Sequence, residues 1–279
     1  MAGQQAEYWN SPAARPWAEQ HERQDLALAG LATAALEAAA PRAGERVLDI
    51  GCGSGTTVLA LAARVGPGGH VLGADISQQS VARARERIAA AGLPQAEVIC
   101  ADVASHAFAP QSFDLAFSRL GVMFFDNPTA AFTNVQRAMK PAGRLALAVF
   151  RPASENPWPN APLGAVRDLL PPTPPAGRDE PGMFSLSDPA RVRRILEGAG
   201  FRHVSLTPFD MDYQIAGAGG GVEAAEFALL FGPLTRVVPG LPAEQRLAVR
   251  AALETFFQGH VTPRGVAFPA AFWIVQAHA

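Results

Sequence analysis

Between residues 46 and 150, short apolar runs alternate with stretches of helical composition. The apolar runs are RVLDI (46–50), HVLGAD (70–75), AEVICAD (96–102), FDLAFSR (113–119) and RLALAVF (144–150). The helical stretches between them are Thr56–Arg64, Gln78–Ala91 and Thr129–Lys140. Strands that alternate with helices form a parallel sheet, and right-handed crossovers place helices on both of its faces. The pattern therefore predicts a doubly wound α/β core at about residues 40–150.

The segments that flank this core differ from it in composition and in the order of predicted elements. Residues 6–40 have helical composition. Nine of the 24 prolines fall between residues 152 and 181, and such a long proline-rich connection is usually functional or disordered. After it we expect a capped helix, a long strand, two helices and a last strand, at 188–201, 203–217, 222–232, 242–258 and 265–279. No linker between independent domains is visible.

Composition argues against several classes of protein. Charged residues make up 17% of the chain and the net charge is −2, so no strong field attracts nucleic acid or an anionic membrane. The two cysteines give no disulfide framework, and no Cys/His cluster has zinc spacing, so we expect no metal. The N-terminal sequence MAGQQAEYWN lacks the apolar core of a signal peptide. The longest apolar run, Leu26–Ala40, falls short of the ~20 residues of a membrane span, and we expect a cytoplasmic protein.

The most informative stretch is VLDIGCGSG, residues 47–55, where a buried strand ends in an acid and a glycine-rich turn leads into a helix. Glycines let the backbone approach a ligand closely, and ligands of open α/β sheets bind beyond the carboxyl ends of the strands. Thr56 stands where a dinucleotide motif has its third glycine, and the lysine of a phosphate loop is absent. Asp49, just before the turn, suits a cationic ligand better than a diphosphate.

This stretch resembles the first motif of the class I S-adenosylmethionine-dependent methyltransferases. Later features match that family in order and spacing, because Asp75 and Asp102 end the second and third runs and FDLAFSR resembles the fourth-strand motif. The stretch PTAAFTNVQRAMKPAGRLALAVF resembles the helix, Pro-x-Gly turn and fifth strand of the family. The resemblance covers about residues 46–150. It implies a Rossmann-like, doubly wound, seven-stranded mixed sheet whose last hairpin supplies the antiparallel strand.

The resemblance also implies the cofactor S-adenosylmethionine and the residues that bind it. Asp75 would hold the ribose hydroxyls, and Asp102 with Val103 would hold the adenine amino group and ring. Carboxylates accept hydrogen bonds from the diol and the amines, and backbone N–H groups of the glycine turn receive the cofactor's carboxylate. We expect Cys52 to lend its backbone rather than its thiol. The full predicted set is Asp49, Gly51, Cys52, Gly53, Asp75, Ile76, Asp102, Val103, Ser118 and Arg119.

In the related family the N-terminal helical segment covers the cofactor. The resemblance therefore predicts a lid at residues 1–40, the cofactor-binding core at 41–150, and substrate-cap segments with the last strands at 151–279. The predicted lid and substrate-pocket residues are Tyr8, Trp9, Trp17, Met123, Phe124 and Trp158. Met123 and Phe124 fit either the core or a pocket wall. His21 is the candidate general base, with an exposed helix face as the alternative, and positioning alone could also carry the reaction.

The predicted function is methyl transfer from S-adenosylmethionine to a small, mostly apolar or aromatic metabolite. A tRNA, rRNA or protein methyltransferase is the alternative within the fold, but no basic segment or nucleic-acid motif supports it; Asn127-Pro128 is followed by Thr129. A nicotinamide-dependent oxidoreductase would need the missing third glycine and a Tyr-x-x-x-Lys pair. A cofactor-binding protein without catalysis is the third class. The acceptor is left open, and so is the oligomeric state, with a homodimer as one candidate.

Overall fold

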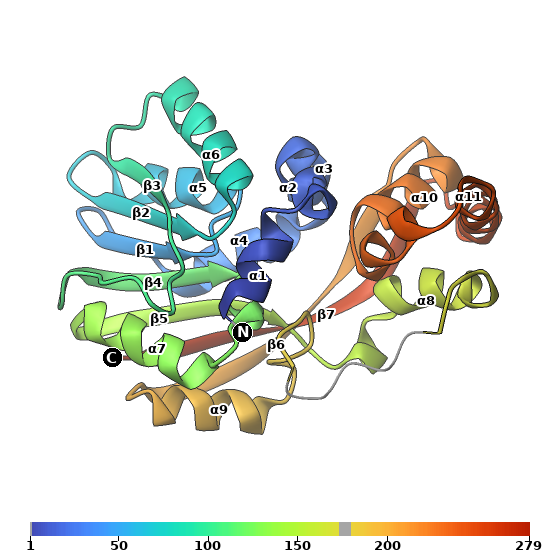
Figure 1. Cartoon of the computed structure of the whole chain (residues 1–279). Coiled ribbons are helices and arrows are strands. Elements are labelled where there is room, and N and C mark those ends of the chain that lie inside the picture. Colours follow the sequence, from blue (N-terminus) through green and yellow to red (C-terminus); the bar gives the residue numbers. More distant parts are fainter. Residues whose placement is uncertain (1, 173–179) are drawn as a thin grey trace.

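The computed structural model describes residues 2–172 and 180–279. Its centre is a seven-stranded sheet in the order β3-β2-β1-β4-β5-β7-β6 (Figure 1). The strands are β1 (Arg46–Ile50), β2 (His70–Asp75), β3 (Ala96–Cys100), β4 (Phe113–Arg119), β5 (Met139–Phe150), β6 (Arg202–Ala216) and β7 (Val266–His278). Pairing is parallel from β3 to β5, and β7 runs antiparallel to both β5 and β6. The predicted mixed sheet is confirmed.

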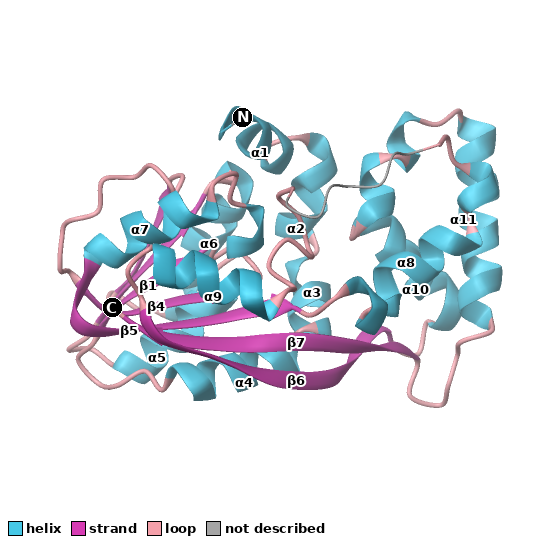
Figure 2. Cartoon of the chain, turned by 90° about the horizontal axis from the view of Figure 1, so that it is seen from below, coloured by secondary structure: helices cyan, strands magenta, loops and turns pink. Residues whose placement is uncertain are grey.

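Helices cover both faces of this sheet. The helices of the described residues are α1 (Ala2–Trp9), α2 (Arg15–Glu19), α3 (His21–Ala27), α4 (Ala29–Ala39), α5 (Thr56–Val65), α6 (Gln78–Ala91), α7 (Pro128–Ala138), α8 (Pro157–Ala165), α9 (Pro189–Gly198), α10 (Gly220–Leu230) and α11 (Ala243–Gln258). In Figure 2, α4 and α5 lie on one side of the strands and α7 and α9 on the other. The sheet is therefore doubly wound, as the alternation of runs predicts.

The junction of α7 and β5 differs from the sequence expectation. The helix ends at Ala138 and the strand begins at Met139, well before the expected start at Arg144. A register shift in the β4–β5 pairing lies in this stretch, and Lys140 within it forms an ion pair with Asp114 of β4 at 2.8 Å. The irregular stretch is thus tied to the neighbouring strand, which composition alone does not reveal.

The N-terminal segment is a chain of short helices rather than one long helix. Proline interrupts it early, because Ser11 and Pro12 begin a separate 3-10 turn after α1. The last of these helices, α4, packs against β4, β5, β6 and β7 and buries Leu31 completely. Only α1, α2 and α3 lie away from the sheet's face, beyond the strand ends (Figure 1). Residues 2–27 are the part of the predicted lid, residues 1–40, that does not pack on the sheet's face with α4, and we call them the lid helices.

Strands β6 and β7 continue past their neighbours and carry a second group of helices. Their pairing extends from Arg202 and His278 to Ala216 and Val266, and residues 217–265 form the insertion between them. In that insertion α10 packs against α11 (Figure 1). Helix α8, which precedes β6 in the chain, packs against α11 and β7. We call α8, α10, α11 and the 3-10 turn Pro233–Arg236 the helical cap. Residues 173–179 of the proline-rich stretch lie outside the described residues.

Two general features of the described ranges bear on function. None of the helices in residues 2–172 and 180–279 is long and apolar enough to cross a membrane. The same residues contain no group of three or more His, Cys, Asp and Glu side chains that could hold a metal ion.

The ends of β1 and β4 meet at a backbone contact that leaves no room for a side chain. A Cβ on Gly121 would lie 2.7 Å from the Ile50 carbonyl oxygen and 2.8 Å from the Gly51 Cα. Ser118 closes the same corner, since its hydroxyl donates to the Ile50 carbonyl oxygen at 2.7 Å and accepts from the Gly121 N–H at 3.2 Å. Glycine at 121 thus lets the two strand ends approach each other.

We expect Gly121→Ala to lower the free energy of unfolding by about 2–3 kcal/mol, because the methyl group meets fixed backbone atoms. Gly53→Ala is the matched control, since Gly53 has φ 53° and a Cβ there meets nothing within 4 Å. Its expected cost is about 1 kcal/mol, from the left-handed backbone alone. Urea unfolding of both variants measures the difference, and equal costs would contradict the role given to the contact.

Candidate active site

A cavity of about 410 Å³ lies at the carboxyl ends of β1, β2 and β4. Its lining comes from the glycine turn, the loops after the strands, the lid helices and the near side of the helical cap. Ligands of open α/β sheets bind at this edge. Of the predicted residues, those that line it are Gly51, Cys52, Gly53, Asp75, Ile76, Asp102, Val103, Arg119, Trp9, Trp17, His21, Met123, Phe124 and Trp158. Asp49, Ser118 and Tyr8 do not line it.

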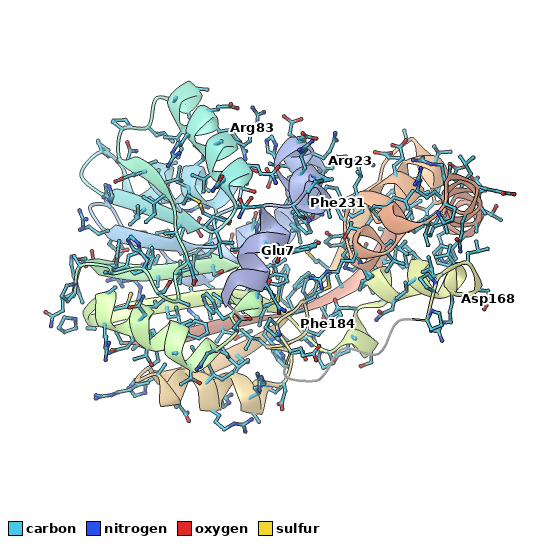
Figure 3. The ribbon with its side chains drawn as sticks, in the orientation of Figure 1. Glu7, Arg23, Arg83, Asp168, Phe184 and Phe231 are labelled. Carbon is cyan, nitrogen blue, oxygen red and sulfur yellow. The ribbon has the colours of Figure 1, made fainter. Side chains whose placement is uncertain are left out.

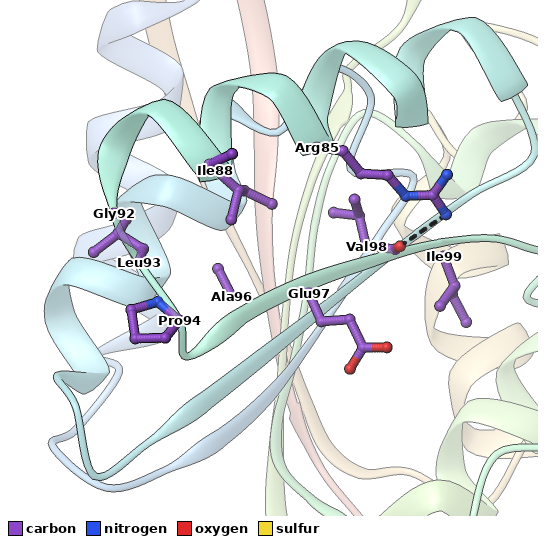
Figure 4. A pocket seen from close by; sticks show the side chains of 10 residues that line it. Arg85, Ile88, Gly92, Leu93, Pro94, Ala96, Glu97, Val98 and Ile99 are labelled. Carbon is purple, nitrogen blue, oxygen red and sulfur yellow. Dashed lines mark hydrogen bonds between the residues drawn. The ribbon is translucent and has the colours of Figure 1, made fainter.

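A second, shallower pocket lies far from the glycine turn, between α6 and the outer strand β3 (Figure 4). Ile88, Leu93 and Ile99 supply apolar surface there. Arg85 crosses it and donates to the Val98 carbonyl oxygen at 3.3 Å. This contact occupies one free acceptor of the edge strand, and none of the predicted site residues lies in the pocket.

The glycine turn adopts the left-handed conformation that its residues permit. Gly51, Gly53 and Gly55 have φ of 67°, 53° and 84°. The Gly51 N–H donates to the Ala74 carbonyl oxygen at 2.8 Å, which ties the turn to β2. The cavity borders Gly53, so the turn presents backbone rather than side chains to a ligand.

Asp75 fixes the turn and the next loop together. Its two carboxylate oxygens accept hydrogen bonds from the Gly53 N–H and the Ser77 N–H, both at 2.8 Å. Burial raises the pKa of Asp75, and these backbone hydrogen bonds oppose that rise. Each carboxylate oxygen retains a second lone pair that a ligand hydroxyl can use.

Asp102 lies in the loop after β3 rather than in the strand, because β3 ends at Cys100. Its carboxylate accepts from the Ala104 N–H at 2.9 Å and from the Ser105 hydroxyl at 3.1 Å. Val103 beside it is 4% exposed and borders the cavity. The predicted adenine residues therefore stand at the cavity on an ordered loop.

Asp49 lies behind the lining, fully buried under the glycine turn. One carboxylate oxygen accepts from the Thr57 hydroxyl at 2.5 Å, and the other has no partner among the described residues. Burial raises the pKa of Asp49 to about 7, and the Thr57 hydrogen bond and the charge of Arg119 oppose the rise. A cationic group in the cavity would stabilise the ionised form.

Ser118 and Arg119, adjacent at the end of β4, have different surroundings. Ser118 is fully buried at the Gly121 contact, so it supports the turn from beneath. The Arg119 guanidinium lines the cavity and approaches the Asp25 carboxylate at 3.4 Å, while its other terminal nitrogen, Nη1, has no partner among the described residues. Asp25 on α3 also accepts from the Thr56 hydroxyl at 2.5 Å. The lid helices are thus joined to the sheet by a partly buried ion pair.

A pair of hydrogen bonds from Asn10 also holds the lid helices beside Asp75. The Asn10 side chain donates to the Ile76 carbonyl oxygen at 3.0 Å and accepts from the Gln78 N–H at 2.9 Å. Trp9, next to it, packs edge-on against Trp17 and Phe124, with ring centroids 5.6 Å and 5.2 Å away. Aromatic rings therefore cover the cavity from the lid side.

The lid helices also contact the helical cap, through partly buried polar groups. The Tyr8 hydroxyl lies 3.4 Å from the Thr235 hydroxyl, and the Arg236 guanidinium stacks over the Tyr8 ring at 4.5 Å. Arg23 of α3 donates to the Glu223 carbonyl oxygen at 3.0 Å, where the two groups of helices meet in Figure 3. Tyr8 is thus turned toward the cap and does not line the cavity.

His21 lies inside the cavity wall and not on an exposed helix face. Its side chain is 5% exposed, and its Nδ1 lies 3.1 Å from the Ala18 carbonyl oxygen. A carbonyl only accepts, so Nδ1 carries the proton and Nε2 carries the lone pair of the neutral ring. The group that orients the His21 ring is thus a backbone carbonyl and not a carboxylate.

The far side of the cavity contains residues that the sequence did not indicate. Tyr213 of β6 is 2% exposed and stacks on Trp158 of α8, with ring centroids 4.7 Å apart and planes 16° apart. Its hydroxyl donates to Gln24 Oε1 at 3.0 Å.

Met123 is buried and still lines the cavity, so it serves both core and pocket wall. Burial raises the pKa of the Cys52 thiol, which fits a backbone role.

The strand order, the glycine turn and the carboxylates at strand ends define a Rossmann-like methyltransferase domain. Residues 41–171 match the family described as a methyltransferase domain. Residues 41–171 thus form a methyltransferase domain of the S-adenosylmethionine-dependent type.

Relatives of known name support this assignment. Nocamycin O-methyltransferase from Saccharothrix syringae is 33% identical over 186 residues, 64% of this chain and 66% of its own length. Aklanonic acid methyltransferase DauC from Streptomyces sp. (strain C5) is 34% identical over 113 residues, 40% of this chain and 51% of its own length. The chain thus spans about half to two thirds of the length of these two relatives.

Solved structures show the same fold at low sequence identity. The YcgJ protein from Bacillus subtilis has a TM-score of 0.57 at 19% identity, covering 88% of this chain and 97% of its own. The cyclase SpnF has a TM-score of 0.53 at 19% identity, covering 88% and 79%. Because one of these folds carries a cyclase, the likeness shows architecture and not reaction.

The raised pKa of Asp49 predicts a pH effect on the ligand-free protein. The folded chain keeps a proton on Asp49 up to pH about 7, whereas the unfolded chain releases it near about pH 4. The folded state then binds more protons, so this group's contribution to stability falls as pH rises through that window. Asp49→Asn should therefore lose less unfolding free energy between about pH 5 and 8 than the unsubstituted chain.

Urea unfolding at several pH values measures this difference. Asp114→Asn is the control, because the pKa of Asp114 is lowered, with hydrogen bonds from Arg46 and Lys140 outweighing its burial. Its stabilising contribution is lost only on acidification below about pH 4. Parallel pH profiles for the unsubstituted chain and Asp49→Asn would contradict the assignment.

Proposed function

We propose that this protein transfers the methyl group of S-adenosylmethionine to a small, mostly apolar or aromatic metabolite. The observation that carries the proposal is that one cavity joins the glycine turn and strand-end carboxylates to a wall of aromatic side chains and one buried histidine. A cofactor and a flat acceptor can therefore meet in a single enclosed space.

The residues present fit the cofactor group by group. Asp75 has free lone pairs for the ribose diol, and Asp102 with Val103 borders the space for adenine. The partner-free oxygen of Asp49 beneath the turn favours an ammonium nearby, and the partner-free nitrogen of Arg119 favours a carboxylate. The donor set thus matches a ligand that carries both charges.

Bound S-adenosylmethionine supplies a methyl group that is already activated on a sulfonium. The chain then has to align the acceptor and exclude water, which can supply ~7–11 kcal/mol of the barrier. Trp9 and Trp17 on the lid helices cover the cavity, and Asn10 and Asp25 hold these helices in place. His21 Nε2 is available to take a proton from an acceptor hydroxyl.

The chemistry of the acceptor wall supports a small molecule over a macromolecule. The wall around Trp158, Tyr213 and Phe150 is aromatic, and the chain's net charge is −2. The names of two relatives, nocamycin O-methyltransferase and aklanonic acid methyltransferase, concern small molecules. Cytoplasmic location and homodimer formation stay predictions, and so does the absence of a nucleic-acid partner.

Removal of the Asp75 carboxylate should weaken cofactor binding. Asp75→Ala should raise the Kd for S-adenosylhomocysteine at least tenfold, because hydrogen bonds to a charged acceptor contribute about 1.5–3 kcal/mol each. Calorimetric titration measures the Kd. Asp114→Ala is the control carboxylate, at the opposite end of β4 from the cavity, and should leave the Kd unchanged. Unchanged affinity in folded Asp75→Ala would exclude the ribose role.

His21→Ala should reduce turnover by ~10²–10⁴, the usual contribution of a general base, with little change in affinity for S-adenosylhomocysteine. His21→Gln is the matched variant, because glutamine is polar and cannot take the proton. Turnover is measured on the acceptor that the unsubstituted protein methylates. A fall of less than about threefold would show that positioning alone carries the reaction.

A further inference from the structure

Buried polar atoms without partners gather around the cavity. In the described part of the chain, five such atoms belong to its lining residues: Gln5 Oε1, Trp17 Nε1, Gln24 Nε2, Arg119 Nη1 and Trp158 Nε1. All but the first are hydrogen-bond donors. A buried donor without a partner costs free energy, so a concentration of them points to a ligand that supplies acceptors. The cavity therefore favours ligands that carry oxygen atoms.

Gln24 is the donor whose orientation the structure determines. Its side chain is 5% exposed on α3, and its Oε1 accepts the Tyr213 hydroxyl hydrogen at 3.0 Å. This bond assigns the amide, because a tyrosine O–H with no other acceptor donates to the oxygen and leaves Nε2 as the free end. Tyr213 is in turn held by its stack on Trp158, so the amide has one preferred direction.

Gln24 and His21 form a pair of opposite character on one helix face. They stand three residues apart on α3, a spacing that brings side chains together. The packing of α3 against β6 places this face at the Tyr213 side of the cavity. Both residues line the cavity; His21 carries an acceptor, Nε2, and Gln24 carries two N–H donors with no partner among the described residues. A ligand that forms hydrogen bonds with both side chains has a hydroxyl, which donates to His21, next to a carbonyl oxygen, which accepts from Gln24.

We propose that the methyl acceptor is a flat phenol or enol whose hydroxyl neighbours a carbonyl, and that Gln24, oriented by Tyr213, is the residue that selects the carbonyl. This inference rests on the proposed function. His21 Nε2 takes the hydroxyl proton while the oxygen forms a bond to the methyl carbon and the carbon–sulfur bond breaks. The sulfur keeps the electron pair, giving S-adenosylhomocysteine, and the imidazolium later loses its proton to water.

The aromatic wall fits the flat part of such a molecule. Trp158 and Tyr213 stack on each other, and both rings line the cavity. A conjugated hydroxy-carbonyl system is planar, so it can lie along these rings while its two oxygens face α3. A purely apolar acceptor would leave the Gln24 and Trp158 donors unsatisfied.

Binding to the S-adenosylhomocysteine-saturated protein tests the inference with matched probes. The probes are 1-hydroxy-2-acetonaphthone, which has both groups, 1-naphthol, which lacks the carbonyl, and 2-acetonaphthone, which lacks the hydroxyl. We expect the hydroxyketone to bind at least about tenfold more tightly than 1-naphthol, the usual effect of a buried hydrogen bond. Gln24→Leu should abolish this preference, because leucine has no N–H donor for the carbonyl. Gln24→Glu should reverse it, because an acceptor then faces the carbonyl.

Tyr213→Phe tests the positioning role. It frees the Gln24 amide to rotate, so the preference for the hydroxyketone should shrink about threefold or more, while thermal stability serves as the control for folding. Equal binding of the hydroxyketone and 1-naphthol, or no binding of either, would overturn the inference. Failure of the unsubstituted protein to bind S-adenosylhomocysteine would instead overturn the proposed function. The two failures are therefore distinguishable.

Discussion

The Asp75 carboxylate is the interaction on which the geometry of the site depends. Its oxygens hold the backbone of Gly53 on one side and of Ser77 on the other, so the glycine turn and the loop before α6 cannot move independently. Asn10 binds the same loop at Ile76 and Gln78, which extends the connection to the lid helices. One carboxylate thus links the glycine turn, through the loop before α6, to the lid helices.

Partly buried charge plays a corresponding role at the other side of the glycine turn. Asp25 joins α3 to Arg119 and to Thr56 at the start of α5, and Arg87 of α6 approaches the same carboxylate at 3.5 Å. A carboxylate shared by two guanidinium groups leaves positive charge in the cavity wall. The unpaired Asp49 carboxyl lies beneath the same region, with a pKa of about 7. The wall therefore has both signs of charge available to a zwitterionic ligand.

The sequence predicted the residues that line the glycine-turn side of the cavity more completely than those at its Tyr213 side. Gly53, Asp75 and Asp102 belong to local motifs in which a strand, a turn and a helix follow one another, so spacing alone places them. Gln24 and Tyr213 are 189 positions apart, and only tertiary packing joins them. Neither residue type has a spacing signal, and a polar residue within a short helix looks like a surface residue.

The insertion between β6 and β7 has a consequence for how such a protein can diversify. The chain leaves the sheet after Ala216 and returns at Val266, and these two residues are paired partners in neighbouring strands. Whatever is inserted between them begins and ends at one point of the sheet, so its length and sequence place no demand on strand register. None of the residues that the structure shows lining the cavity lies in this insertion, whereas Phe227 within it packs behind Trp158 and Tyr213. Evolution can therefore exchange residues 217–265, and with them the support behind one wall, while the lining itself stays as it is.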